Sequence, residues 1–270
     1  MRYPFVMHHS CLPLLNFEAF EAVPAALLSA RGNVTARALS GADWVFRRKG
    51  DGRYLAVATF TGLRALWPVQ WGKALGRGTG EAVWQRLYGC EMRREAEHLP
   101  LASMRHWLMR LGIGPDYARE RGLNAVAEPT RLCFAGRDRF GRPLWLTARA
   151  AVAWQSMKVA AARDGVVLEA ISGYRSHAYQ YGIFERKLAR GQSLAQILAV
   201  NAAPGFSEHH SGCALDLGTP DEPPAEESFE ATDAFAWLCG RAEEFGFVLS
   251  YPRDNPHGIV YEPWHWCVRA

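Results

Sequence analysis

Residues 207–216 read Ser-Glu-His-His-Ser-Gly-Cys-Ala-Leu-Asp, and residues 262–265 near the C-terminus read Glu-Pro-Trp-His. Together they supply three histidines, one aspartate and a spare glutamate. A catalytic zinc site uses three protein ligands, leaves a fourth position open for water and has a base beside it. Both stretches are polar and carry turn residues, so core packing explains them poorly. They predict the metal site of a metallopeptidase.

The first stretch can bring its polar side chains to one side of a strand. Asp216 follows Ala214 by two residues, so on a strand both point to one face while Leu215 and Leu217 point to the core. Gly212 permits a sharp turn before this strand, so that a preceding histidine can converge with Asp216 on one ion.

The second stretch must bend to place two side chains together. Glu262 and His265 are three residues apart, and Pro263 interrupts a regular ladder and permits that bend. Spacing alone leaves open whether His209 or His210 is a ligand. Any one of these histidines alone is more often structural than a ligand, but their combination with an aspartate and a glutamate favours a functional site.

Arg175 is the next candidate, in Ser-Gly-Tyr-Arg-Ser at residues 172–176, just past a predicted strand. Its planar guanidinium can bind a carboxylate through two hydrogen bonds or polarise a scissile carbonyl. A surface ion pair is an equal alternative at this point.

Charge divides the chain unevenly. Residues 1–146 contain 21 Lys or Arg and 12 Asp or Glu, whereas residues 147–270 contain 10 and 15. With the Gly- and Arg-rich segment at 136–146, this predicts a basic N-terminal domain of unknown role at 1–135 and a zinc peptidase domain at 136–270. The chain shows no export signal and no apolar run that could span a bilayer. Its six cysteines lack a tight framework, so we expect buried free thiols.

The pattern of elements is α+β, with a small antiparallel sheet flanked by helices in the rear domain and a smaller α+β domain before it. Residues 1–30 look helical in patches, and Asp-Gly at 51–52 joins two strands of a hairpin within residues 43–60. Helices are expected at 101–111, 147–164, 178–190 and 232–245, with a short one capped by Ser193. Strands are expected at 166–171 and from 247.

Three motifs resemble the VanY-like zinc D-alanyl-D-alanine carboxypeptidases and the related D-Ala-D-Ala dipeptidases. They are Ser-Gly-Tyr-Arg-Ser with Gln180 beyond it, Ser-x-His-x-x-Gly-x-Ala-x-Asp, and Tyr-Glu-Pro-Trp-His-Trp at 261–266. The resemblance covers about residues 140–270 and departs from the family at Cys267, where arginine is common. It implies Zn²⁺ bound by His209, Asp216 and His265, with His210 in an unconstrained slot. It also implies Glu262 as catalytic base, Arg175 stabilising the tetrahedral intermediate, and substrate contacts from Ser207, Gln180 and Tyr174.

The resemblance implies removal of the terminal D-Ala from peptidoglycan stem peptides. Alternatives are a D-Ala-D-Ala dipeptidase, an L,D-carboxypeptidase or a wall endopeptidase, and, from another class, a catalytically inactive zinc-stabilised wall-binding module. We expect a peptidoglycan peptide as partner, no nucleic acid, and contact of the basic front half with an anionic polymer as a further option. The substrate favours the cell envelope, and the lack of a signal peptide allows the cytoplasm.

Overall fold

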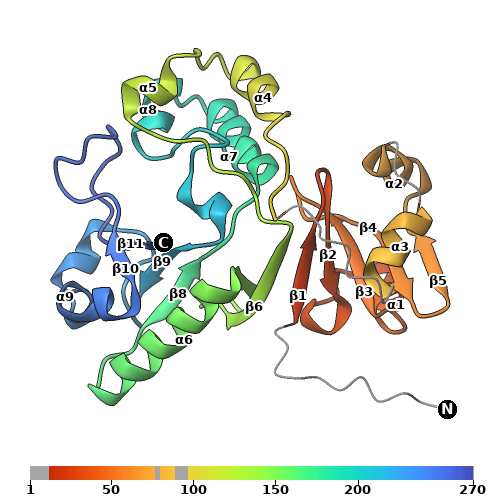
Figure 1. The fold of residues 1–270 in the computed structure, drawn as a ribbon, viewed down its shortest axis with the longest axis horizontal. Coiled ribbons are helices and arrows are strands. Elements are labelled where there is room, and N and C mark those ends of the chain that lie inside the picture. The colour runs from red at the N-terminus through yellow and green to blue at the C-terminus, as the bar shows by residue number, and fades with distance from the viewer. Residues whose placement is uncertain (1–11, 77–79, 89–96, 270) are drawn as a thin grey trace.

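The computed structural model describes residues 12–76, 80–88 and 97–269. Its strands form two antiparallel sheets, one of seven strands in the order β5-β4-β3-β2-β1-β6-β7 and one of four in the order β10-β11-β9-β8. The larger sheet and the smaller one lie on opposite sides of the molecule, and helices flank both (Figure 1). The predicted α+β class, with a small antiparallel sheet among helices in the rear half, is confirmed.

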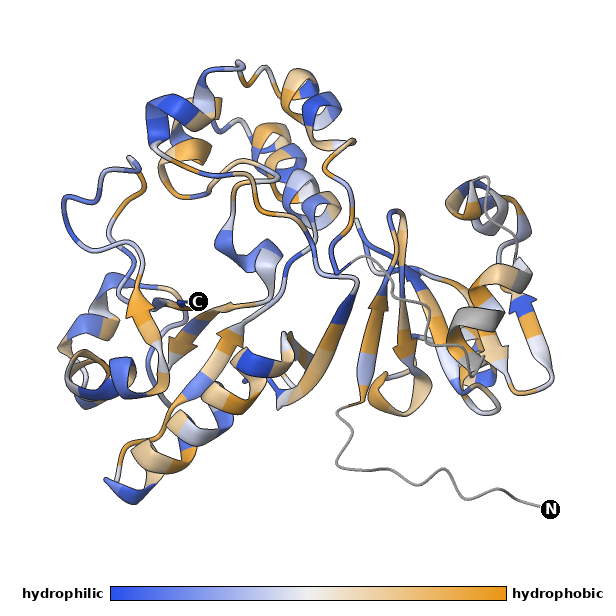
Figure 2. Cartoon of the chain, in the orientation of Figure 1, coloured by the Kyte–Doolittle hydropathy of each residue, from blue (hydrophilic) through white to orange (hydrophobic). Residues whose placement is uncertain are grey.

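The front sheet is built mainly from the first third of the chain. Hydrophobic residues run along β1, β2 and β6 (Figure 2), and Phe46 and Trp71 belong to a core on one face of the sheet. The strands are β1 (Pro13–Asn16), β2 (Phe20–Pro24), β3 (Trp44–Arg48), β4 (Tyr54–Thr59), β5 (Gly62–Ala65), β6 (Arg131–Arg137) and β7 (Pro143–Leu146), and the helices beside them are α1 (Asn33–Leu39), α2 (Pro68–Leu75), α3 (Gly80–Tyr88) and the 3₁₀ turn η1 (Ala25–Leu27).

The rear sheet packs on two helices. Leu215 and Leu217 point into the core between sheet and helices, as the alternation on their strand predicts. Its elements are α6 (Ala148–Arg163), β8 (Glu169–Ser172), β9 (Ala214–Gly218), α9 (Asp233–Arg241), β10 (Phe247–Leu249), β11 (His265–Val268) and the 3₁₀ turns η2 (Glu208–Ser211), η3 (Glu227–Ala231) and η4 (Ala242–Phe245).

A third group of helices covers one end of the molecule (Figure 1). It consists of α4 (Met104–Arg110), α5 (Tyr117–Arg121), α7 (His177–Ala189) and α8 (Leu194–Ala199). Leu111 and Tyr117 from the first pair share one hydrophobic core with Phe184 and Ile197 from the second. Residues on both sides of the expected boundary at 135/136 therefore pack together here.

The two halves are also joined through a sheet. Leu14 of β1 lies opposite Leu132 of β6, and β6 pairs in turn with β7, so the front sheet continues past residue 136. The division of the chain into domains 1–135 and 136–270 stays a prediction.

Capping residues determine where three helices of the rear half begin. Thr147 and Ser176 accept hydrogen bonds from the first turns of α6 and α7, and Ser193 forms a capping box with Gln196 at α8. These helices lie where the sequence predicts them. The prediction of helical patches before residue 30 is wrong for 13–16 and 20–24, because pairing with β6 and β3 makes these residues strands β1 and β2. Residues 1–11, which it also covered, lie outside the described residues.

Two further expectations concern cysteines and membranes. Among the described residues Cys133, Cys213, Cys239 and Cys267 are free, and Cys239 is exposed rather than buried; Cys11 and Cys90 lie outside the described residues. Within the described ranges, every helix is too short or too polar to cross a bilayer.

Gly212 forms the turn that leads into β9, with a backbone φ of 69°. A Cβ added there would lie 2.5 Å from Leu132 Cδ2 and 3.3 Å from the Thr147 backbone nitrogen. Gly165 has a similar φ of 81° and open space around it.

We therefore expect Gly212→Ala to lower the free energy of unfolding by about 2–4 kcal/mol, because crowding adds to backbone strain. Gly165→Ala should cost only the strain, about 1–2 kcal/mol. Urea unfolding of both variants measures the difference. Equal losses would show that the turn tolerates a side chain.

Candidate metal centre

Three buried side chains from the two sequence stretches converge in the rear sheet. The ligand atoms of His209, Asp216 and His265 all lie within 4.8 Å of one another. His265 on β11 lies directly opposite Asp216 on β9 in the strand register, and His209 enters from η2. A cross-strand pair and one residue from a short turn thus form a compact set of two nitrogens and one carboxylate.

Hydrogen bonds orient both imidazoles. His209 Nδ1 lies 2.8 Å from the Gly173 carbonyl oxygen and donates to it, which turns Nε2 toward Asp216 Oδ2 at 3.3 Å. His265 Nε2 lies 3.1 Å from Glu208 Oε2, and its Nδ1 lies 3.1 Å from Asp216 Oδ1. Each ring therefore faces the centre with one nitrogen and is held from behind through the other, as in protein metal sites.

The electrostatics of this cluster favour a cation. Burial lowers the pKa of His265, but hydrogen bonds to Asp216 and Glu208 outweigh burial and raise it to about 10. Burial raises the pKa of Asp216, yet the two histidines hold it well below its usual range. Buried carboxylates gathered around the imidazoles create a negative potential that a divalent cation would neutralise.

Glu262 stands beside the three ligand candidates rather than among them. Its Oε2 lies 3.8 Å from His265 Nδ1, and burial raises its pKa from 4.5 to about 7. Its backbone N–H donates to the Tyr251 carbonyl, and the His265 N–H donates to the Glu262 carbonyl, so the bend around Pro263 is fixed by hydrogen bonds. A carboxyl group with a pKa near neutrality is suited to take up and release a proton.

Arg175 reaches the same centre from the loop after β8. Its guanidinium donates to Gln180 Oε1 at 3.0 Å and to Ser172 Oγ at 3.3 Å, and lies 3.7 Å from Asp216 Oδ2. Gln180 is itself fixed by donating to the Ala202 carbonyl. Neutral partners therefore position the arginine, and its positive charge is not neutralised by them and acts on the metal centre.

A cavity of about 440 Å³ opens over the centre. It is lined by the three ligand candidates together with Glu262, Arg175, Gln180 and Ser207, and by Lys187 from α7. No carboxylate of the described residues forms an ion pair with Lys187. All predicted site residues except Tyr174 thus line one cavity.

Tyr174 and His210 serve the loop that carries Arg175. His210 Nδ1 donates to the Arg175 carbonyl at 2.6 Å and its Nε2 accepts from the Gly205 N–H, so both ring nitrogens are used away from the metal candidates. The Tyr174 hydroxyl donates to Glu128 and accepts from Asn16. Contact of Tyr174 with substrate stays a prediction.

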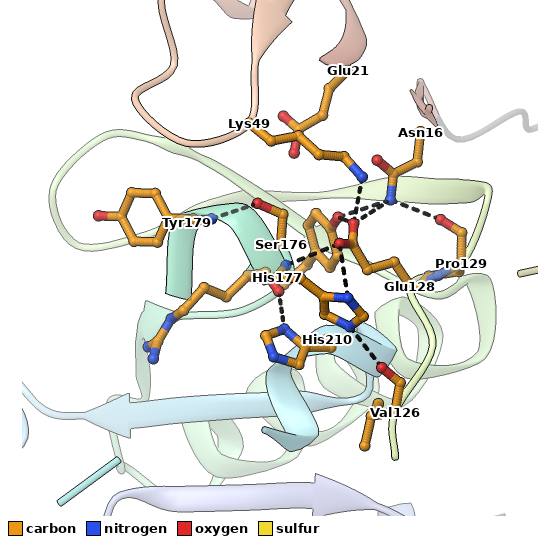
Figure 3. A network of polar contacts seen from close by, with 12 residues as sticks. Asn16, Glu21, Lys49, Val126, Glu128, Pro129, Ser176, His177, Tyr179 and His210 are labelled. Atoms are coloured by element: carbon orange, nitrogen blue, oxygen red, sulfur yellow. Dashed lines mark hydrogen bonds and ion pairs between the residues drawn. The ribbon is translucent and has the colours of Figure 1, made fainter. Parts of the chain in front are cut away.

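Glu128 lies at the middle of the buried network in Figure 3. One carboxylate oxygen pairs with Lys49 Nζ at 2.5 Å and accepts from Tyr174, and the other accepts from the His177 backbone N–H at the start of α7. Burial raises the pKa of Glu128, but the charges of Lys49 and His177 lower it to about 2. The hairpin turn of the front sheet is thereby tied to the segment that positions Arg175.

Residues 143–269 match the family model VanY, described as D-alanyl-D-alanine carboxypeptidase. The rear half of the chain is a VanY domain. The match includes every residue of the metal centre and the loop that carries Arg175, and it begins after strands β1–β6 of the front sheet.

Curated relatives match the VanY domain at moderate identity. YodJ of Bacillus subtilis is 35% identical over 126 residues, and the D-alanyl-D-alanine carboxypeptidase of Enterococcus faecalis is 33% identical over 124. These matches cover 45% and 42% of this chain and 45% and 44% of the relatives, so the chain spans less than half of their length. The solved VanYB complex with D-alanine-D-alanine is 28% identical, with a TM-score of 0.41 over 50% of this chain and 76% of that one.

Sequence reasoning missed Glu208 of the VanY domain and Glu128, which precedes that domain. Glu208 is adjacent to His209 inside the quoted motif, and its position there was the one available signal. Glu128 lies 49 residues before His177 and 79 after Lys49, in no pattern that points to either.

Substitutions at the metal centre should weaken Zn²⁺ binding to different degrees. Asp216→Ala should abolish stoichiometric Zn²⁺ binding, because it removes a ligand candidate. Glu208→Gln should weaken binding by about 10–100-fold, since it supports a ligand without touching the ion. Competition against a fluorescent chelator measures both, with the exposed His106→Ala as control. Unchanged affinity in Asp216→Ala would refute the site.

The Glu128 network predicts a pH-dependent stability. Glu128→Gln should lower the free energy of unfolding by about 3–5 kcal/mol at pH 7, because Lys49 stays buried without its counter-charge. The folded pKa of about 2 lies below the ordinary 4.5, so this stabilisation is present above pH 4.5 and is lost as the pH falls toward 2.

Urea unfolding of wild type and Glu128→Gln between pH 7 and pH 3 should therefore show a difference that shrinks with acid. Glu243→Gln, at an exposed position, is the matched control. A difference that stays constant over this range would contradict the assignment.

Proposed function

We propose that the chain is a zinc-dependent D,D-carboxypeptidase that removes the terminal D-alanine from peptidoglycan stem peptides. One observation carries this proposal: Glu262, Arg175 and the three ligand candidates line a single cavity. The VanY match and the D-alanyl-D-alanine carboxypeptidases among the relatives support the same activity.

The residues present fit a zinc ion. Two imidazole nitrogens and one carboxylate form a donor set typical of catalytic zinc, and the carbonyl of Gly173 and the carboxylate of Glu208 hold the rings from behind. When bound, zinc supplies a Lewis acid that lowers the pKa of a coordinated water and polarises the scissile carbonyl.

The chain's own residues then divide the remaining work. Glu262 accepts the proton of the attacking water and delivers it to the amine of the leaving D-alanine. Arg175 donates hydrogen bonds to the oxygen on which negative charge develops. Gln180 keeps that guanidinium in place, and Lys187 offers a positive charge to the substrate's terminal carboxylate within the same cavity.

The shape of the site favours a carboxypeptidase over a dipeptidase. A second, larger cavity of about 840 Å³ adjoins the first, and Arg175 and Asp216 line both. A chain longer than a dipeptide can therefore extend away from the centre. Glu262 supports an active enzyme over a zinc-stabilised binding module, because its carboxylate lines the cavity beside the three ligand candidates without being one of them.

Mass spectrometry of a stem pentapeptide incubated with the zinc-loaded full chain tests the proposal. We expect loss of one D-alanine, and Glu262→Gln should reduce kcat by roughly 10²–10⁴-fold while zinc still binds, because the base is lost. Glu243→Gln is the matched control. Cleavage of free D-Ala-D-Ala alone would make the protein a dipeptidase, and zinc binding without cleavage of either would favour the binding module.

A further inference from the structure

The larger cavity is a groove between the front sheet and the VanY domain, and we call it the basic groove. The front sheet and its loops contribute residues 27–29, Arg31, the turn between β3 and β4, the end of β6 and residues 140–142 to the lining. The VanY domain contributes residues 143–145, residues 171–176 and the start of α7. The basic groove meets the cavity of the metal centre at Arg175, Asp216 and Ala225. A peptide whose scissile bond lies at the centre can continue directly into it.

The charge of the basic groove is strongly positive. Seven lysine or arginine side chains line it, against four aspartates or glutamates. Most of these cations already have partners: Arg47 pairs with Glu21, Arg48 with Asp51, Lys49 with Glu128, Arg142 with Asp138, and Arg175 approaches Asp216.

Two arginines differ from the rest. Arg31 and Arg137 are exposed, and among the described residues neither has a carboxylate partner. Arg31 donates to the Gly52 carbonyl at 3.3 Å, and Arg137 donates to the carbonyls of Gly141 at 2.7 Å and Leu27 at 3.4 Å. Each guanidinium carries five N–H groups, so both are oriented by the backbone and keep donors for a ligand.

Both arginines belong to one part of the groove. Leu27, Leu28, Ser29 and Arg31 of one loop line it, and Arg137 donates to the Leu27 carbonyl, so both guanidinium groups belong to or contact this loop. The turn between β3 and β4, whose Gly52 carbonyl accepts from Arg31, is held by the buried Lys49–Glu128 pair. The exposed rings of Phe140 and Tyr179 add apolar contact surface along the same groove.

We propose that the basic groove binds the acidic, non-leaving part of a peptide substrate, with Arg31 and Arg137 pairing with its carboxylates. This inference rests on the proposed function. The leaving residue needs little space and fits the cavity of about 440 Å³, whereas the remaining chain needs the groove of about 840 Å³. Continuity with the metal centre favours this occupant over a separate anionic polymer, which would need no access to the centre.

Fluorescence anisotropy with two labelled peptides tests the proposal. Both end in D-Ala-D-Ala, and one carries two glutamates upstream where the other carries glutamines. The zinc-loaded full chain with Glu262→Gln serves as receptor, so that no peptide is consumed. We expect at least 10-fold tighter binding of the glutamate peptide, and loss of that preference when Arg31→Gln and Arg137→Gln are added.

The control double variant Arg131→Gln with Arg163→Gln removes the same charge from exposed positions outside the groove and should keep the preference. Equal binding of both peptides, or equal loss in the control, would overturn the proposal. It would also be overturned if inorganic polyphosphate bound through Arg31 and Arg137 without competing with the glutamate peptide.

Hydrolysis separates this proposal from the proposed function. If wild type cleaves the glutamate peptide and the Arg31/Arg137 double variant has an unchanged KM, the proposed role of the groove is refuted and the proposed activity is supported. If wild type cleaves neither peptide but binding still requires both arginines, the proposed activity is refuted and the proposed role of the groove is supported.

Discussion

One buried carboxylate, that of Glu128, links the front sheet to the segment that carries Arg175. Glu128 accepts from Tyr174 and from the first backbone N–H of α7, and its charge is balanced by Lys49 from a turn of the front sheet. Burying an ionised pair has a large desolvation cost, which is recovered only when geometry and hydrogen bonding are nearly complete. Through Glu128 the front hairpin therefore contributes to the position of the segment that carries Arg175.

The side chains of the metal centre are positioned mainly by the rear sheet. Two of its ligand candidates project from directly opposite positions on paired strands, and the third from the turn η2, which ends at Gly212 in a left-handed conformation. Backbone carbonyl and carboxylate groups behind the imidazoles determine which nitrogen faces the centre. Such a site needs little rearrangement to accept an ion, because its ligands are positioned by the fold.

Sequence reasoning succeeded where the deciding interaction is local. Thr147 and Ser193 mark helix starts within a few residues, and the alternation around Leu215 and Leu217 separates core from cleft. It failed for residues 13–16, which form a strand by pairing with β6 more than a hundred residues away, and for residues 20–24, which pair with β3. The Lys49–Glu128 pair was hidden for the same reason, since nothing near either residue indicates that they meet.

The pairing of β9 with β11 makes the metal site dependent on correct strand register. Strand side chains alternate between faces, so a slip of one residue would send His265 and Asp216 to opposite sides of the sheet. The same slip would turn Trp266 and Val268 of β11 away from the core, and the misregistered chain would have no place for an ion. Metal occupancy thus reports strand register, and a cation that binds during folding would selectively trap the chains that paired correctly.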